Sequence, residues 1–287
     1  MISVLKHELR LYFHSLTAYV FGAFLLIVVG IGSVLYNLQA AVSNFEFVLS
    51  FSSLIFAVIV PILTMRVIAE ERKQKTDQLL YSLPISTTEI VVGKYLALLV
   101  VYLLPLLIVA TYPVTFAQFG DVYLPTSYGS LFAYFMMGAA LIAVGVFISS
   151  LTEHQGFAAG IGIAVILLNY FSVSLAEYVS ATAVGSSVVL MIAAILLGLL
   201  IRHLTKNDAL AQIIAFAMMI SIVAVLWLDA ERLEGLVPEI IKTLSLFARF
   251  DTFVNGVFDI TAIVYFVSVM IFFLFLTVQS LEKRRYN

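Results

Sequence analysis

Charged side chains are scarce in this sequence. They account for 11% of the 287 residues, whereas hydrophobic residues account for 63% and the mean hydropathy is +1.11. Soluble domains carry about 25% charged residues, so this chain has too few charges to cover the surface of a water-soluble globule. We therefore expect the protein to lie in a membrane, with lipid among its partners.

Cysteine is absent, which excludes disulfides, thiolate metal sites and cysteine nucleophiles. The HExxH, GxSxG and GxxxxGK[ST] motifs are absent too, and the four histidines are scattered along the chain. The centres of the apolar runs contain no Asp, Glu, Lys, Arg or His, the groups that a proton relay requires. We expect no catalytic residue, metal or cofactor on this chain and no nucleic acid partner. Energy for uphill transport would then come from another protein.

Long apolar runs are what the sequence has in abundance. A helix needs about 20 apolar residues to cross a hydrocarbon core about 30 Å thick. Eight runs meet this need, at 17–38, 45–66, 90–118, 128–150, 157–177, 182–203, 209–228 and 260–281. The alternating ten-residue strands typical of a membrane barrel are not found. We predict an all-α integral membrane fold, a polytopic bundle of about eight spans in a single transmembrane domain over residues 1–287.

Basic residues indicate the orientation of the chain. Of the fifteen Lys and Arg residues, twelve lie in or beside the N-terminal region, the 66–94 segment, the 202–206 loop and the C-terminal tail. Because cytoplasmic loops carry the excess of Lys and Arg, we expect these regions and both termini in the cytoplasm. An even number of spans agrees with this. The 229–259 segment is then extracytoplasmic.

Residues 1–16 have the pattern of an amphipathic interfacial helix. Apolar side chains recur at helical spacing, while Lys6, His7, Arg10 and His14 occupy other faces. Such a helix lies in the membrane interface with its basic side chains toward anionic headgroups. The alternative is a frayed cytoplasmic end.

The connection between the second and third runs is the longest and most charged cytoplasmic one. Charged residues are dense over 66–77, and an apolar turn follows at Leu79, Leu80, Leu83 and Pro84. Ser86 or Thr87 can cap the next helix, with Glu89 in its first turn. A charged helix followed by an apolar turn can dock into a groove on a soluble partner. The alternative is a solvated loop with ordinary positive-inside charge.

Several blocks of sequence carry a resemblance to a known family. They are Pro61-Ile62-Leu63-Thr64-Met65-Arg66, Ala69-Glu70-Glu71-Arg72, Thr76 through Leu80, Leu83-Pro84-Ile85-Ser86, Gly93-Lys94-Tyr95, Ser149-Ser150-Leu151-Thr152 and Leu274-Phe275 through Leu281-Glu282-Lys283-Arg284-Arg285. With these blocks the sequence resembles the permease subunits of type-2 ABC exporters (the ABC-2 family), especially the gliding-motility-like branch. The blocks cover most of the chain except about 178–228, and together they are quite specific.

The resemblance implies a working unit of two permeases and two separate ATPase subunits, with ATP and Mg²⁺ bound by the ATPases. It implies that residues 66–89 form a cytoplasmic coupling segment, seated in a cleft of the ATPase. The residues that it places at this contact are Arg66, Glu70, Glu71, Arg72, Thr76, Asp77, Gln78, Leu79 and Leu80. The N-terminal helix would be the connecting helix of the family, along the inner membrane face.

The chain departs from the family pattern in two places. Lys75-Thr76 stands where a Gly-Thr pair is common, which leaves the form of the local turn open. The eight runs also exceed the six spans that are common in the family. The surplus matches residues 178–228, which we interpret as an inserted helical hairpin.

The fifth run has two features of helix packing. Gly156, Gly160 and Ala164 form a row of small residues, which lets helices approach closely. Since the first and fifth spans commonly line the dimer seam in the family, this row is a candidate contact with a second permease copy, identical or related. Packing within one subunit is the alternative. Asn169, the most deeply placed strongly polar residue, is interpreted as an interhelical hydrogen-bonding residue rather than a substrate ligand.

Residues and resemblance together predict a non-enzymatic permease subunit of an ATP-driven exporter in the cell membrane, with a bacterial inner or cytoplasmic membrane as the expected location. Two alternatives remain. One is a mechanical transducer that acts on an extracytoplasmic partner without moving cargo, and the other is an ion-coupled secondary transporter. Apolar span interiors favour lipidic, amphipathic or peptide cargo over small ions.

Overall fold

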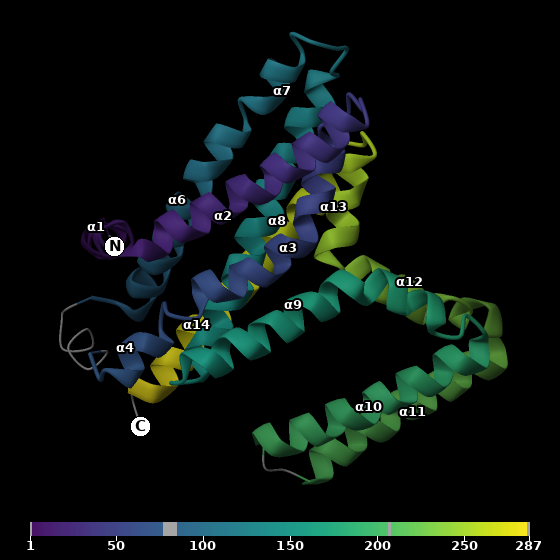
Figure 1. Ribbon diagram of the computed structural model, residues 1–287. Coiled ribbons are helices and arrows are strands. Elements are labelled where there is room, and N and C mark those ends of the chain that lie inside the picture. The colour runs from purple at the N-terminus through teal and green to yellow at the C-terminus, as the bar shows by residue number, and fades with distance from the viewer. Residues whose placement is uncertain (1, 77–84, 206–207, 286–287) are drawn as a thin grey trace. The chain divides into compact units, whose positions relative to one another are not determined.

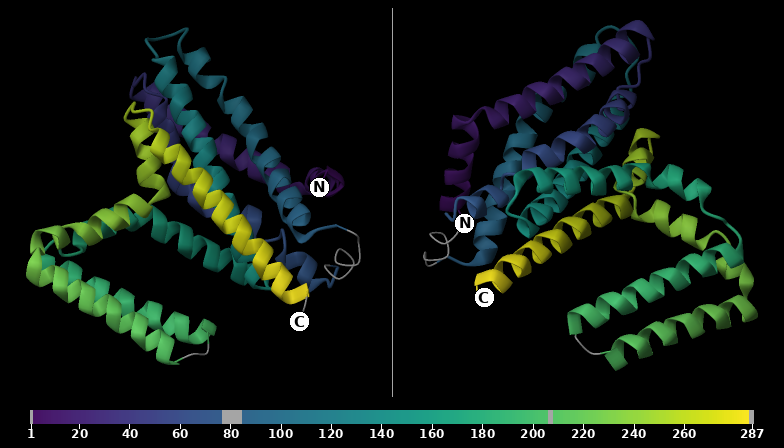
Figure 2. Two further views of the ribbon diagram at one scale, coloured as in Figure 1. Left: turned by 180° about the vertical axis from the view of Figure 1, so that it is seen from behind. Right: turned by 60° about the horizontal axis from the view of Figure 1, so that its bottom comes forward.

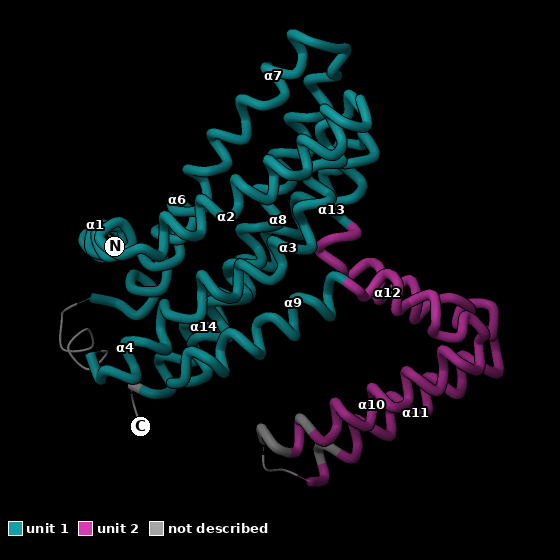
Figure 3. Tube along the Cα trace, viewed as in Figure 1, with its two compact units in different colours: residues 1–170, 249–287 teal, residues 171–248 magenta. Residues whose placement is uncertain are grey.

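The computed structural model describes residues 2–76, 85–205 and 208–285, and the regular structure in these ranges is helical throughout (Figure 1). The chain divides into two compact units (Figure 3). Unit 1 comprises residues 1–170 and 249–287, and unit 2 comprises residues 171–248.

Within the described residues, six helical segments are long and apolar enough to cross a membrane, which confirms the predicted polytopic bundle. Their main helices are α2 (Leu16–Ser33) continued by the π-helical η1 (Val34–Gln39), α3 (Glu46–Thr64), α6 (Thr87–Val109), α8 (Leu124–Leu151), α9 (Gln155–Tyr178) and α14 (Ile260–Arg285). Each overlaps one of the runs expected from hydropathy. The third run is divided, since α6 ends at Val109 and the short α7 (Tyr112–Phe116) begins one residue before Pro113.

Helix α8 is the centre of unit 1. It is the most buried of the six spans and packs against α3, α6 and α14. Small residues let these helices approach closely. Gly138 lies against the ring of Tyr102 and Gly145 against Thr64, and a Cβ at either glycine would overlap the neighbouring side chain.

The N-terminal helix α1 (Ile2–His14) is separate from α2. The break falls at Ser15, whose hydroxyl caps α2 by accepting a hydrogen bond from the backbone amide of Thr17 at 3.4 Å. Helix α1, the short α4 (Ala69–Lys73) and the end of α14 lie at one end of unit 1, and α7 lies at the other (Figures 1 and 2). Helix α1 and the end of α14 therefore lie at the same end of unit 1 as α4, as an even number of crossings between them requires.

Unit 2 contains the two further apolar runs. Helices α10 (Ala183–Thr205) and α11 (Asp208–Leu228) pack against each other, and their apolar stretches, Ala183–Leu199 and Gln212–Leu228, are shorter than the six spans of the other helices. That these two helices also cross the membrane, and that 178–228 is an insertion, stay predictions.

The rest of unit 2 is built from short helices. The 3-10 helix η2 (Ala230–Leu233) leads through Gly235, which has a left-handed φ of 69° that suits glycine, into α12 (Leu236–Leu244). Helix α12 is amphipathic and exposes Ile240 and Leu244. The chain then returns to unit 1 through α13 (Leu246–Val254).

Candidate functional site

The described part of the coupling segment begins directly after α3. The chain turns over residues 65–68 and then forms α4, which has five residues. A helix of this length has almost no stability of its own, because nucleation is unfavourable and few hydrogen bonds follow it. The position of α4 is therefore set by its contacts with the rest of unit 1.

Ser149 of α8 provides the first of these contacts. Its hydroxyl accepts hydrogen bonds from the backbone amides of Ile68 (3.2 Å) and Ala69 (3.1 Å) and donates one to the carbonyl of Met65 (3.1 Å). The N-terminal amides of a helix lack partners within the helix, and Ile68, the capping residue of α4, offers no side-chain hydrogen bond. A residue of another helix thus caps α4.

Arg72 provides the second contact, at the end of α8. Its side chain is buried at 5% exposure, and its guanidinium donates hydrogen bonds to the carbonyls of Ser150 and Thr152. Arg284 of α14 donates to the neighbouring carbonyl of Leu151 at 3.2 Å. Two arginines from distant parts of the sequence therefore meet the unpaired carbonyls at the C-terminus of α8, where cations are favoured.

Lys94 provides the third contact, and it is the most buried charge in the described part of unit 1. Its Nζ lies 2.6 Å from Oε1 of Glu8 in α1 and 2.6 Å from Oε1 of Glu71 in α4. The exposed fractions of the three side chains are 2% for Lys94, 7% for Glu8 and 24% for Glu71. We call these three residues the Lys94 cluster. It joins α1, α4 and α6 through one ammonium group, which has three donors to offer.

Tyr12 of α1 lies beside this cluster. Burial, followed by the nearby charges of Glu8, Glu71 and Glu70, raises the pKa of its phenol, which therefore stays neutral. Among the described residues, no group of three or more His, Asp or Glu side chains could hold a metal ion. Since Lys94 engages a carboxylate oxygen of Glu8 and one of Glu71, the chemistry of this cluster is that of ion pairing between helices.

Other residues of the coupling segment are directed to the surface. Lys73, Gln74 and Lys75 are exposed, and Arg66 pairs with the half-exposed Glu70 at 3.3 Å. Lys75 has a φ of 57°, the left-handed conformation that glycine adopts most easily. The turn that glycine would favour at this position is therefore present, with lysine in its place.

The residues expected at the ATPase contact are thus divided between two environments. Arg66 and Glu70 lie at the surface, whereas Glu71 and Arg72 bind inside unit 1. Thr76 is half-buried and bonds to the carbonyl of Glu71 through both its amide (2.9 Å) and its hydroxyl (3.2 Å). The remaining expected residues, Asp77, Gln78, Leu79 and Leu80, lie outside the described residues.

The start of α6 follows one of the two capping predictions. Ser86 caps the helix by accepting a hydrogen bond from the amide of Glu89 at 3.2 Å, and the carboxylate of Glu89 accepts one from the amide of Ser86 at 3.4 Å. This reciprocal pair is a capping box. It confirms Ser86, rather than Thr87, as the capping residue.

The row of small residues on α9 is exposed. Gly156, Gly160 and Ala164 have open faces, and no heavy atom of the described chain lies within 4 Å of a Cβ built at either glycine. Asn169, further along α9, is half-buried. The row therefore does not pack within unit 1, and its contact with a second copy stays a prediction.

The burial of two acidic residues was not predicted from the sequence. Glu8 lies in α1, where the apolar and basic residues define the amphipathic pattern. Glu46, at the start of α3, is 3% exposed and accepts hydrogen bonds from Asn44 (2.6 Å) and Ser127 (3.3 Å). The sequence feature that indicates the Lys94 cluster is Lys94 itself, because a lysine within an apolar run needs a counter-charge nearby.

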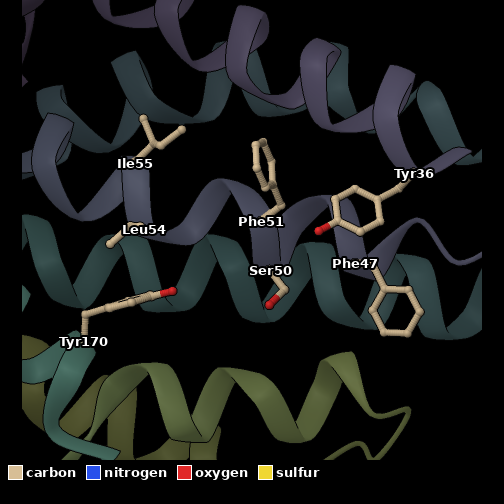
Figure 4. Close-up of a pocket in the computed structure, with 7 residues that line it drawn as sticks. All are labelled: Tyr36, Phe47, Ser50, Phe51, Leu54, Ile55 and Tyr170. Atoms are coloured by element: carbon tan, nitrogen blue, oxygen red, sulfur yellow. The ribbon is translucent and has the colours of Figure 1, made fainter. Parts of the chain in front are cut away.

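Unit 1 also has an open groove, with a volume of about 350 Å³. Figure 4 shows the side chains that line it, which come from η1, α3 and α9. They are Tyr36, Phe47, Ser50, Phe51, Leu54, Ile55 and Tyr170. Apart from three hydroxyl groups the lining is apolar and aromatic, so the groove offers many apolar contacts and few hydrogen bonds.

Comparison with protein families identifies a match. Residues 29–184 match a family described as ABC-2 family transporter protein. The matched range is more than half of the chain and contains α3, the coupling segment, α6 and α8. No curated protein matches the chain.

Proposed function

The chain belongs to the ABC-2 family of transporter proteins, and from this premise we propose that it is a permease subunit that exports cargo with energy from a separate ATPase subunit. Membership of the family makes it a multi-pass membrane subunit of an ABC transporter. The direction of transport and the coupling to ATP are the parts we propose. Placement in the gliding-motility-like branch stays a prediction from the sequence blocks.

The observation that carries the proposal is the construction of the coupling segment. Helix α4 is held from within by Ser149, Arg72 and Glu71, and it presents Lys73 and Lys75 outward. A solvated loop would not need three sets of buried polar contacts to hold one turn of helix. A surface through which a partner transmits movement does need such contacts, because it must keep its conformation while the partner moves it.

The partner we propose is a cytoplasmic ATPase with a cleft that accepts this surface. Binding of ATP would close a pair of such ATPases, move the two coupling segments and change the packing of the spans. Nucleotide can drive this change only through its different affinity for the two states of the complex. In this mechanism ATP and Mg²⁺ bind to the ATPase, and the chain performs no covalent chemistry.

Co-purification with a Walker-type ATPase encoded by a neighbouring gene tests the proposal. We expect the wild-type chain to retain the ATPase and to support ATP turnover in liposomes. Lys73→Glu/Lys75→Glu should weaken the complex by at least about tenfold, since charge complementarity across the contact is reversed. Arg232→Glu/Lys242→Glu makes the same charge change at exposed positions of unit 2 and should have no effect. Failure of the wild-type chain to bind the ATPase would overturn the proposal.

We also propose a second permease copy as a partner, in contact through the small residues of α9. The chain has no cysteine, so a single introduced cysteine reports cross-linking without background. A cysteine at Gly156 or Gly160 should form disulfide-linked dimers in membranes under mild oxidation. A cysteine at Val264, which is exposed on α14, is the control and should not. Equal cross-linking at the two helices would count against a seam along α9.

The cargo class that we propose is lipidic, amphipathic or peptidic. Apolar spans and the aromatic groove of unit 1 support it, because both favour apolar groups over hydrated ions. Stimulation of ATP turnover by such molecules, but not by small ions, would be the expected result in reconstituted complexes.

A further inference from the structure

The Lys94 cluster connects three elements that are far apart in the sequence. Lys94 is 86 residues from Glu8 and 23 residues from Glu71, yet its ammonium lies 2.6 Å from an oxygen of each. In the described structure the two carboxylates are linked to each other through this one group. The cluster therefore adds one buried ionic link between α4 and the pair formed by α1 and α6, two helices that also pack against each other.

We propose that Lys94 is a positioning residue that passes movement of α4 to α1 and α6 during the ATP cycle. The proposal rests on the proposed function, since it takes α4 to be the element that the ATPase moves. The cluster would make the start of the third span and the interfacial helix follow the coupling segment. Neither helix would then respond to nucleotide by itself.

The chemistry of the cluster supports transmission over simple stabilisation. A buried ion pair gives little net stability, because the cost of desolvating its charges offsets their attraction. Apolar side chains of similar size would hold three helices together at least as well. What the charges provide instead is a specific pairing with directional hydrogen bonds, so that one arrangement of the three helices is preferred over neighbouring ones.

The position of α4 supports it as well. Glu71 and Arg72 are adjacent in the sequence but bind in different places, Glu71 to Lys94 of α6 and Arg72 to the end of α8. Because α4 is too short to hold its own position, these two side chains and the cap from Ser149 define where it sits. Movement of α4 thus reaches α1 and α6 through Glu71, and α8 through Arg72 and Ser149. Removing the carboxylate of Glu71 should therefore interrupt the connection to α1 and α6 and leave the connection to α8.

Distances between spin labels can report the movement of α1 and the movement of α6 separately. We would place nitroxides on introduced cysteines at Ser3 (α1) or Thr88 (α6), each paired with Lys283 (α14), three exposed positions. The complex with the ATPase would be reconstituted in lipid nanodiscs, with labelled chains diluted by unlabelled ones. Distances would be measured without nucleotide and after trapping with Mg-ATP and vanadate.

We expect both label pairs of the wild-type chain to change distance on trapping. Glu8→Ala should reduce the change of the Ser3 pair and keep that of the Thr88 pair, because the link from α4 to α6 remains and α1 then follows α6 only through its packing against it. Glu71→Ala should abolish both changes, measured at an ATPase concentration that saturates the complex. Each single variant leaves Lys94 with one carboxylate, so the buried ammonium keeps a counter-charge. Glu8→Gln and Glu71→Gln, which preserve side-chain volume, replace either variant that does not fold.

The controls are Glu231→Ala and Glu239→Ala, which remove exposed carboxylates of unit 2 and should leave both changes intact. The proposal is overturned if Glu71→Ala shows wild-type changes for both pairs, or if the wild-type pairs do not move on trapping. A wild-type chain that binds no ATPase at all would instead remove the proposed function. The two failures are therefore distinguishable.

Discussion

The hydroxyl oxygen of Ser149 accepts the backbone amide of Ala69 at 3.1 Å, so a side chain of α8 caps a helix that begins 80 residues earlier in the chain. The same oxygen accepts the amide of Ile68. The base of the coupling segment is thus attached directly to the most buried helix of unit 1.

Replacement of Ser149 by alanine should loosen α4. It leaves two buried amides without an acceptor, and a buried unpaired polar group costs about 1–3 kcal/mol. We expect a loss of about that size in the free energy of unfolding and faster hydrogen exchange at residues 68 and 69. Ser150→Ala is the matched control, because the hydroxyl of Ser150 donates within its own helix, to the carbonyl of Phe147 at 2.7 Å. Equal exchange rates in the two variants would contradict the capping role.

Neutralising Lys94 alone should be costly. Lys94→Met leaves the carboxylate of Glu8 buried without its ammonium partner, and breaking a buried ion pair from one side costs about 3–5 kcal/mol. The triple variant Glu8→Gln/Glu71→Gln/Lys94→Met removes all three charges, and its thermal stability should return to or exceed that of the wild type. Thermal unfolding in detergent measures both. A triple variant that is no more stable than Lys94→Met would argue against a desolvated charge cluster.

Gly145→Ala should disturb the contact between α8 and α3. The added methyl group would overlap the hydroxyl and Cβ of Thr64, whose branched side chain has little freedom to move and whose hydroxyl bonds to Val60 at 3.1 Å. Overpacking of this kind costs about 1–3 kcal/mol. Gly30→Ala, at a helical glycine with no neighbouring heavy atom within 4 Å, should instead be neutral or raise stability by up to about 1 kcal/mol. A reversed order of melting temperatures would refute the packing argument.

Lys75→Gly should stabilise the turn after α4. The left-handed φ of 57° at Lys75 costs a residue with a Cβ about 1 kcal/mol relative to glycine. We expect slower proteolysis of the coupling segment and a gain in unfolding free energy of up to about 1 kcal/mol. Lys73→Gly, inside α4, is the control and should lose about 1 kcal/mol, because glycine is unfavourable in a helix. The chain should be measured without the ATPase, since both lysines lie on the proposed contact surface.

Asp259 should make stability depend on pH in the acidic range. A hydrogen bond from the hydroxyl of Thr261, together with bonds from the first amides of α14, lowers the pKa of Asp259 below its ordinary value. A folded pKa below the unfolded value, which is about 4 for aspartate, gives stability that is present above the unfolded pKa and lost as pH falls through the folded pKa. The difference in melting temperature between the wild type and Asp259→Asn, which keeps an acceptor but does not titrate, should be constant above about pH 6 and shrink below about pH 4. A constant difference down to pH 3 would exclude this role.

Much of the fold could be predicted because it depends on local properties. The length and apolar composition of a run decide whether it can cross a bilayer, and six of the eight runs are long apolar helices in the structure. The capping box at Ser86 and Glu89 was also predictable, since its two partners are three residues apart. Prolines in the third run also indicate a kink at Pro105 or Pro113, and the structure divides this run after Val109, just before Pro113, while α6 continues through Pro105.

The sequence predicted where the coupling segment lies in the chain, but not which of its side chains point into unit 1. Charge density located the coupling segment, yet Arg72 and Glu71 bind inside unit 1, where their partners come from α8, α6 and α1. No periodicity shows that Lys94 lies between two carboxylates, because the three residues meet only after the helices have packed. Hydropathy and charge are properties of short windows, so they were enough to locate the six long apolar helices and the charged coupling segment. Which charges are shared between helices and which are left at the surface depends on how those helices pack, because packing sets burial and distance.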